Sequence, residues 1–251
     1  MADEIRIRVD GVTVGYGRDT VLEDASLIVR DGDFLGIIGP NGGGKTTLIK
    51  AMLGLLEPWR GTVERRKLER PGAMGYVPQL GPLEQQPPLR VEELVALGRP
   101  RYLSRRESRE VTRDAVRTTL ERVGLQERSG TLVADLSGGQ WQRTLVARAL
   151  VAEPEILFLD EPMAAVDAEF RRVLVELLQE LNRRIPVVVV THDLTPFAQV
   201  VRQIACVNRA VHYHPEGKLT PESLEEVYGC PVELISHGVP HRVLPPHGEG
   251  P

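Results

Sequence analysis

The chain has 251 residues, with 31 Lys and Arg against 35 Asp and Glu, which gives a formal net charge of −4. A hydrophobic content of 41% can fill a core, which excludes a chain that is disordered throughout. Only 4% of the residues are aromatic and the chain is slightly acidic, so no nucleic-acid partner is expected. With two cysteines, Cys206 and Cys230, the sequence has neither a disulfide scaffold nor a CxxC zinc motif.

The N-terminal segment is charged from its third residue and lacks the apolar stretch of a signal peptide. The longest apolar runs, such as 156–159 and 187–190, are far too short to span a bilayer. We therefore expect a chain that neither crosses a membrane nor is exported, so that any membrane role depends on a partner.

The first third of the chain changes its hydrophobic pattern once. Residues 5–30 are rich in β-branched residues and are punctuated by predicted turns at Asp10-Gly11 and Asp31-Gly32, which indicates an antiparallel opening. Residues 34–38 then form a continuous apolar run, followed by a glycine-rich loop and a predicted helix over 46–56. A fully apolar strand followed by a helix is typical of a parallel sheet covered on both faces, so we expect an α/β fold.

The middle of the chain reads as helical, with apolar residues spaced by three and four over 91–97 and 111–123. Nine Arg against five acidic residues lie between residues 99 and 128, which makes this region either a solvated helical face or a docking surface. Strand-like runs then return at 156–159 and 187–190, separated by a predicted helix over 168–182, which is a βαβ unit.

The last segment, 211–251, differs in kind because it holds seven prolines and five of the six histidines. It is predicted to be a partly extended C-terminal extension. His237 and His241 have the spacing of a helical metal site, but Pro240 between them makes a helix unlikely to form, so a solvated tail is favoured over a metal site.

Residues Gly39 to Thr46 fit the pattern GxxxxGK[ST], placed between a predicted strand and a predicted helix. Glycines let the backbone wrap closely round phosphates, so that amide groups and the helix N-terminus face the negative charge. In this pattern Lys45 reaches the β- and γ-phosphates and the Thr46 hydroxyl binds magnesium. The segment is predicted to bind a nucleotide.

Two further segments point to phosphate chemistry. Asp160 and Glu161 end the apolar run 156–159, where α/β sheets bind ligands; Asp160 suits support of magnesium and Glu161 suits polarising a water. The segment Leu136 to Gln140 reads LSGGQ before a predicted helix over 141–151, where Ser137 can cap a second helix start able to bind an anion.

Taken together, these motifs resemble the nucleotide-binding subunit of an ABC transporter over roughly residues 5–209. The resemblance implies a P-loop NTPase core with an antiparallel β-subdomain and an inserted helical subdomain at about 88–145, all within an ATPase domain at 1–210. It implies ATP and Mg²⁺ as ligands, with Glu161, His192 and Gln79 as catalytic residues, and Thr46, Gln79 and Asp160 around the metal. It implies nucleotide contacts from Tyr16, Gly39, Asn41, Gly42, Gly43, Gly44, Lys45, Thr46 and Thr47, and from Ser137, Gly138, Gly139, Gln140 and Asp167.

The family resemblance also implies partners. Two copies would sandwich two ATP molecules, so the LSGGQ segment of one copy would serve the nucleotide of the other. The homodimer would dock on transmembrane permease subunits at the cytoplasmic face of the cell membrane as a peripheral protein, with an extracytoplasmic solute-binding protein delivering the cargo. Met163-Ala164 departs from the residues that the family often carries there, which puts only detail near Asp167 in doubt.

The segments 207–209, 219–224 and 227–229 resemble those of zinc and manganese importers, which makes a transition-metal ion the expected cargo. The related siderophore and cobalamin importers remain an alternative. A soluble ABC ATPase that acts on DNA or ribosomes is a further alternative, although such proteins usually carry two cassettes and this chain carries one. A non-hydrolysing regulator is disfavoured because Glu161 and His192 are both present.

Overall fold

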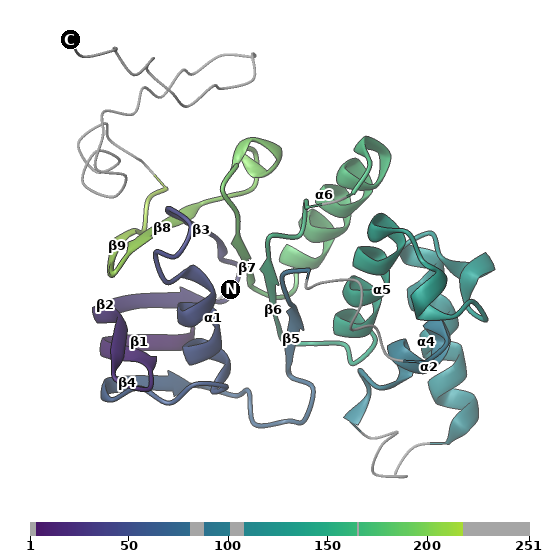
Figure 1. The fold of residues 1–251 in the computed structure, drawn as a ribbon, viewed down its shortest axis with the longest axis horizontal. Coiled ribbons are helices and arrows are strands. Elements are labelled where there is room, and N and C mark those ends of the chain that lie inside the picture. The colour runs from purple at the N-terminus through teal and green to yellow at the C-terminus, as the bar shows by residue number, and fades with distance from the viewer. Residues whose placement is uncertain (1–3, 81–87, 101–107, 165, 218–251) are drawn as a thin grey trace.

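The computed structural model describes residues 4–80, 88–100, 108–164 and 166–217. Two sheets and a group of helices make up the described part (Figure 1). The smaller sheet has the strand order β2-β1-β4, and the larger has the order β5-β6-β7-β3-β8-β9. The strands are β1 (Ile5–Tyr16), β2 (Asp19–Arg30), β3 (Phe34–Ile38), β4 (Arg60–Arg65), β5 (Met74–Val77), β6 (Ile156–Asp160), β7 (Val187–Val190), β8 (Gln203–Asn208) and β9 (Ala210–His214). The α-helices are α1 (Lys45–Leu53), α2 (Val91–Ala96), α4 (Arg109–Arg122), α5 (Gly138–Leu150) and α6 (Ala168–Asn182), and short 3₁₀ turns are η2 (Gln126–Arg128), η3 (Val133–Asp135) and η4 (Thr195–Phe197).

The smaller sheet is antiparallel, as its β-branched pattern predicts. The predicted turn at Asp10-Gly11 is wrong: β1 continues through both residues and its pairing with β2 shifts register between Val9 and Val12. Gly11 has φ 59°, a left-handed conformation that glycine adopts without strain, so the strand absorbs an irregularity there instead of ending.

The larger sheet is parallel from β5 to β8, and β9 closes one edge by antiparallel pairing with β8. Alternate residues of its central strands enter two separate core clusters: Leu157 and Leu159 of β6 pack with the helices α2, α4, α5 and α6, whereas Ile156 and Phe158 pack with α1 and the smaller sheet. The prediction of a sheet covered on both faces is therefore confirmed, and with it the α/β class.

Helix boundaries follow the local chemistry at each end. α1 is shorter than predicted because Gly54 ends it in a left-handed conformation, φ 74°. α5 begins three residues before the predicted start because Ser137 caps it directly. α6 has the predicted bounds, with Asp167 as its N-cap.

The helices α2, α4 and α5 stand together on the side of the large sheet away from β9 (Figure 1). The predicted limits of a helical subdomain at about 88–145 stay a prediction. β9 spans the predicted end of the ATPase domain at residue 210 and carries the sheet to His214. His212 and His214 lie on this strand, and the other histidines of the predicted extension lie outside the described residues. Within the described ranges, no helix combines the length and apolarity that a bilayer crossing needs.

Candidate functional site

The glycine-rich loop lies between β3 and α1, and two of its glycines are required by close packing. A Cβ atom on Gly39, which has φ 150°, would lie 2.0 Å from the carbonyl oxygen of Val207. One on Gly44, which has φ 105°, would lie 2.5 Å from a methyl carbon of Leu22. At these two positions a side chain would meet β8 or β2, so glycine lets the loop lie close to both strands.

The start of α1 is open to an anion. Its N-cap is Gly44, and no side chain caps the helix among the described residues. The ammonium group of Lys45, a residue only 8% exposed, donates hydrogen bonds of 2.9 Å to the carbonyl oxygens of both Gly39 and Pro40. Burial lowers the pKa of Lys45, against the opposing effect of Glu161 and Asp160. The loop thus combines uncapped amide groups with a buried positive charge.

Asp160 at the end of β6 faces the same loop. The Thr46 hydroxyl donates a 2.6 Å hydrogen bond to Asp160 Oδ2. The other carboxylate oxygen, Oδ1, is buried and has no hydrogen-bond partner among the described residues. Burial raises the pKa of Asp160, and the hydrogen bond from Thr46 opposes that shift. An unpartnered carboxylate oxygen beside a hydroxyl suits a hard, oxygen-binding cation such as Mg²⁺.

Glu161 and His192 lie next to this pair. The Nδ1 atom of His192 lies 2.9 Å from Oε2 of Glu161, within hydrogen-bond distance. The Glu161 side chain is 11% exposed and that of His192 is 74% exposed. Glu161 has a left-handed backbone, φ 51°, which is uncommon for a residue with a side chain and is typical of functional positions.

These groups surround a cleft of about 400 Å³. Tyr16 stands at its mouth with 47% of its surface exposed, and the Lys50 ammonium lies 5.6 Å from the ring centre and 3.4 Å from the hydroxyl. Gln79 also lines the cleft, which places it with the residues predicted to surround the nucleotide and metal. The full lining is Tyr16, Val21, Asn41, Gly42, Gly44, Lys45, Thr46, Thr47, Gln79, Asp160 and Glu161.

The LSGGQ segment forms a second, separate cleft. The Ser137 side chain accepts a 3.3 Å hydrogen bond from the backbone N–H of Gln140, and the Gln140 side chain accepts a 3.0 Å bond from the backbone N–H of Ser137. This reciprocal pair is a capping box at the start of α5. Ser137 and Gln140 border a cleft of about 260 Å³ together with Arg143 and Asp167. The adjacent Gly138 and Gly139 form the first turn of the helix.

The structure therefore divides the predicted site residues into two groups. One cleft is lined by Tyr16, Asn41, Gly42, Gly44, Lys45, Thr46, Thr47, Gln79, Asp160 and Glu161, and the other by Ser137, Gln140 and Asp167. Five predicted residues, Gly39, Gly43, Gly138, Gly139 and His192, line neither cleft. The sequence interpretation missed Arg143, which joins the second group, because no motif pattern indicates which side chain a helical arginine contacts.

A turn between β8 and β9 is hydrogen-bonded to the phosphate loop through the main chain, which the sequence interpretation also missed. The N–H of Arg209 donates to the carbonyl oxygen of Gly43 at 3.0 Å, and the Arg209 carbonyl accepts from the N–H of Glu23 at 2.8 Å. Because these bonds are made by the main chain, side-chain identity gives no signal for them.

Comparison with known proteins places this geometry in a family. The family described as ABC transporter matches residues 22–164. The zinc import ATP-binding protein ZnuC of Pseudomonas syringae is 38% identical, over 91% of this chain and 84% of that protein. The manganese transport system ATP-binding protein MntB of Bacillus subtilis is 36% identical, over 89% of this chain and 92% of that protein. A solved dimeric structure of a bacterial ABC transporter cassette is similar with a TM-score of 0.74 and 28% identity, over 85% of this chain and all of that chain. The resemblance predicted from the motifs is confirmed: this chain belongs to the ABC transporter family and is an ATP-binding cassette ATPase.

Proposed function

We propose that this chain is the ATP-hydrolysing subunit of an importer whose cargo is a transition-metal ion, zinc or manganese. The observation that carries the cargo is the similarity, at 36–38% identity over about nine-tenths of the chain, to relatives named for zinc import and manganese transport. Siderophore and cobalamin import is the second candidate, on the weaker motif resemblance of segments 207–209, 219–224 and 227–229.

In this proposal the phosphates of ATP lie in the loop from Gly39 to Thr46, with Asn41, Gly42, Gly43 and Thr47 around them. Lys45 exchanges its two carbonyl partners for phosphate oxygens, and the uncapped start of α1 faces the same charge. The adenine stacks on Tyr16, whose ring is exposed at the mouth of the cleft.

Mg²⁺ fits the donors at the strand end, where Asp160 has an unpartnered oxygen and Thr46 a hydroxyl, with Gln79 on the same cleft. When bound there, the ion neutralises charge on the phosphate oxygens. Glu161 accepts a hydrogen bond from the attacking water and orients it, and His192 holds the Glu161 carboxylate through the 2.9 Å contact and faces the γ-phosphate.

The working unit in this proposal is a homodimer with ATP between the subunits. Ser137, Gln140 and Asp167 would meet the nucleotide of the other copy, since they border a cleft separate from their own phosphate loop. Gly138 and Gly139, in the first turn of α5, would join them. The similarity to a dimeric cassette supports this arrangement.

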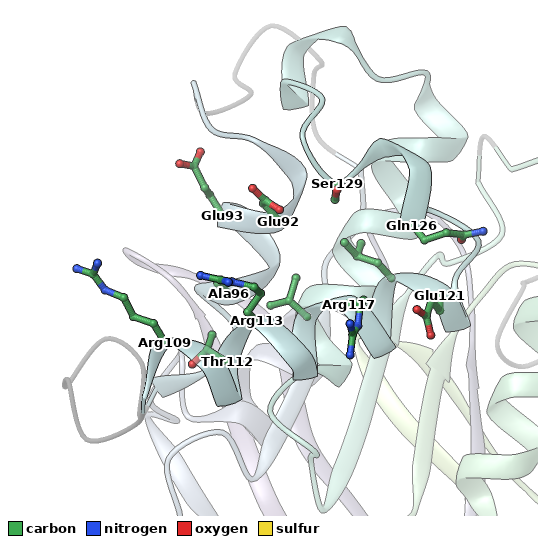
Figure 2. Close-up of a pocket in the computed structure, with 12 residues that line it drawn as sticks. Glu92, Glu93, Ala96, Arg109, Thr112, Arg113, Arg117, Glu121, Gln126 and Ser129 are labelled. Carbon is green, nitrogen blue, oxygen red and sulfur yellow. The ribbon is translucent and has the colours of Figure 1, made fainter.

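The permease is proposed to dock on a groove of about 530 Å³ between α2 and α4. Figure 2 shows Arg113 and Arg117 on α4 and Glu92 and Glu93 on α2 around this groove. Arg109, Arg113 and Arg117 follow one another at four-residue intervals along one helix face, and Val116 and Leu120 supply apolar lining. The groove suits a cytoplasmic segment of a membrane protein with an apolar face and charges of both signs. The subunit would then lie peripherally at the cytoplasmic face, and a solute-binding protein would deliver cargo to the permease.

The cargo is tested in cells that lack the gene. We expect growth to fail under chelation of transition metals and to recover with added zinc or manganese, or with the wild-type gene. The Glu161→Gln gene is the matched control, because it keeps the assembled transporter and removes turnover. Growth that depends instead on a siderophore or on cobalamin would select the second candidate.

The docking surface is tested separately from the cargo. Arg109→Glu with Arg113→Glu should reduce recovery of the subunit in the membrane fraction while the ATPase rate of the purified subunit stays unchanged. Arg172→Glu on α6, an exposed residue of the same charge outside the groove, is the control. If recovery in the membrane fraction is unchanged, the arginines of α4 form a solvated helix face and not a docking surface.

A further inference from the structure

Arg143 lies one and a half turns into α5, on the helix that Ser137 caps, and is fixed at two points. Its Nη2 donates a 2.9 Å hydrogen bond to Oδ2 of Asp167, and its guanidinium carbon lies 4.3 Å from the ring centre of Phe170. The Arg143 side chain is only 20% exposed. Asp167 is the N-cap of another helix, α6, and Phe170 lies in its first turn. Arg143 is thus a bridge between two helix starts.

The carboxylate that Arg143 meets is itself held on both oxygens. Oδ1 of Asp167 accepts the backbone N–H of Phe170 at 2.8 Å as the cap of α6, and Oδ2 accepts Arg143. The hydrogen bond from the Phe170 N–H, followed by the contact with Arg143, lowers the pKa of Asp167, so the carboxylate stays charged. Phe170 is fully buried in the core, which anchors the ring under the guanidinium.

We infer that Arg143 is a positioning residue that locks the starts of α5 and α6 together, so that Ser137 and Asp167 meet the nucleotide of the partner subunit as one rigid surface. The inference rests on the proposed homodimer with ATP between its subunits. It goes beyond that proposal because it assigns the alignment of Ser137 and Asp167 to Arg143, which acts through its contacts with Asp167 and Phe170.

The chemistry of the contact requires arginine. A planar guanidinium can stack on the Phe170 ring and still donate sideways to Asp167, whereas the ammonium of a lysine can satisfy the charge but cannot stack as a plane. Arg143→Lys should therefore keep part of the alignment and Arg143→Ala should lose it.

The first test separates nucleotide binding from turnover in the full-length protein. For Arg143→Ala we expect kcat to fall about 10- to 100-fold, the size of effect that a small misplacement of a distant positioning group produces. Binding of ATP to the monomer should stay unchanged, because the phosphate loop belongs to the other cleft. Arg143→Lys should give an intermediate kcat. Arg172→Ala, which removes an arginine from an exposed ion pair with Glu176 on α6, is the matched control and should match wild type.

The second test measures association of the subunits directly. Glu161→Gln protein with Mg²⁺ and ATP should sediment as a stable dimer, because the dimer is no longer dissociated by ATP hydrolysis. Adding Arg143→Ala should raise the protein concentration needed for dimerisation, Arg143→Lys should raise it less, and Arg172→Ala should not change it. A residue that only supported the fold would instead lower the melting temperature and monomer ATP binding together.

The outcomes separate the two levels of the proposal. If Glu161→Gln protein binds ATP but stays monomeric at every concentration, the composite site fails, and the role of Arg143 fails with it. If that protein dimerises, and the Arg143 variants change neither its dimerisation nor the kcat of the enzyme with Glu161 intact, only the positioning role is overturned. Should Arg143→Ala not fold, the same comparison with Arg143→Lys decides: an unchanged kcat and dimerisation would overturn the inference.

Discussion

The phosphate loop and the LSGGQ segment each present the start of a helix to a polar cleft, but in opposite states. The start of α1 is uncapped, and its partners Lys45 and Asp160 are buried at 8% and 1% exposure. The start of α5 is already closed by the reciprocal hydrogen bonds of Ser137 and Gln140, and Ser137 is exposed. The Ser137 oxygen only accepts in this cap, so its O–H can still donate to a phosphate while the cap stays intact. One half of the site offers free backbone N–H groups to a ligand, and the other offers a side-chain hydroxyl on a helix start that is already capped.

The largest effect is expected in the part of the site formed by the phosphate loop and the carboxylates beside it, here called the loop half. Glu161→Gln should lower kcat by about 10²–10⁴-fold, because the group that polarises the attacking water is removed. ATP affinity should persist, since the loop and Lys45 are untouched. Steady-state hydrolysis beside equilibrium binding of ATP measures both quantities. Near-normal turnover in this variant would assign the polarising role elsewhere.

Mixing subunits sharpens the comparison, because each half of the site can be disabled alone. Lys45→Ala should abolish ATP binding in one subunit, and Ser137→Arg should block the second cleft in the other. Each variant alone should show only background hydrolysis, whereas the mixture should recover activity because one intact composite site remains in each mixed dimer. A mixture as inactive as its parents would show that the halves do not work across subunits.

The burial of Asp160 gives a pH-dependent test of the loop half. Because its pKa is raised, Asp160 binds its proton more tightly in the folded apo protein than in the unfolded chain. The contribution of Asp160 to the free energy of unfolding therefore falls as the pH rises from the pKa of the unfolded state through that of the folded state. Asp160→Asn should therefore raise the apo melting temperature at neutral pH. Mg²⁺-ATP at 100 times its Kd should raise the free energy of unfolding of the wild type by about 2.7 kcal/mol. The same ligand concentration should stabilise the variant much less. Thermal melts with and without Mg²⁺-ATP check both signs, and an apo variant less stable than wild type would contradict the first.

The smallest effect concerns the exposed rim of the loop half. Tyr16→Ala should weaken ATP binding about tenfold, because stacking of a base on an aromatic ring is worth about 1–3 kcal/mol. Tyr16→Phe keeps the ring and loses only the hydroxyl near Lys50, so it should bind ATP nearly as well as wild type. Equal ATP affinities for the wild type and both variants would show that the adenine does not stack on Tyr16.

Most residues that line the phosphate-loop cleft are predicted from the sequence, because glycines, Lys45 and Thr46 stand at fixed spacing and the carboxylates at a strand end. Val21 lines the cleft without being predicted, and Gly39, Gly43 and His192 are predicted but lie outside its lining. The second half was predicted only in part. Ser137 was identified as a cap, but the contact of Arg143 with Asp167 and Phe170 joins helices that are distant in sequence, and no spacing rule encodes it. The turn expected at Asp10-Gly11 was wrong because a glycine and an aspartate can also serve a bulge within a long strand.

The main-chain link through Arg209 has a consequence for the timing of amide exchange with solvent. Its N–H is bonded to the Gly43 carbonyl of the phosphate loop, and its carbonyl to the Glu23 N–H on β2. A ligand that stiffens the loop must therefore slow deuterium uptake at residues 23 and 209, although neither lines the nucleotide cleft.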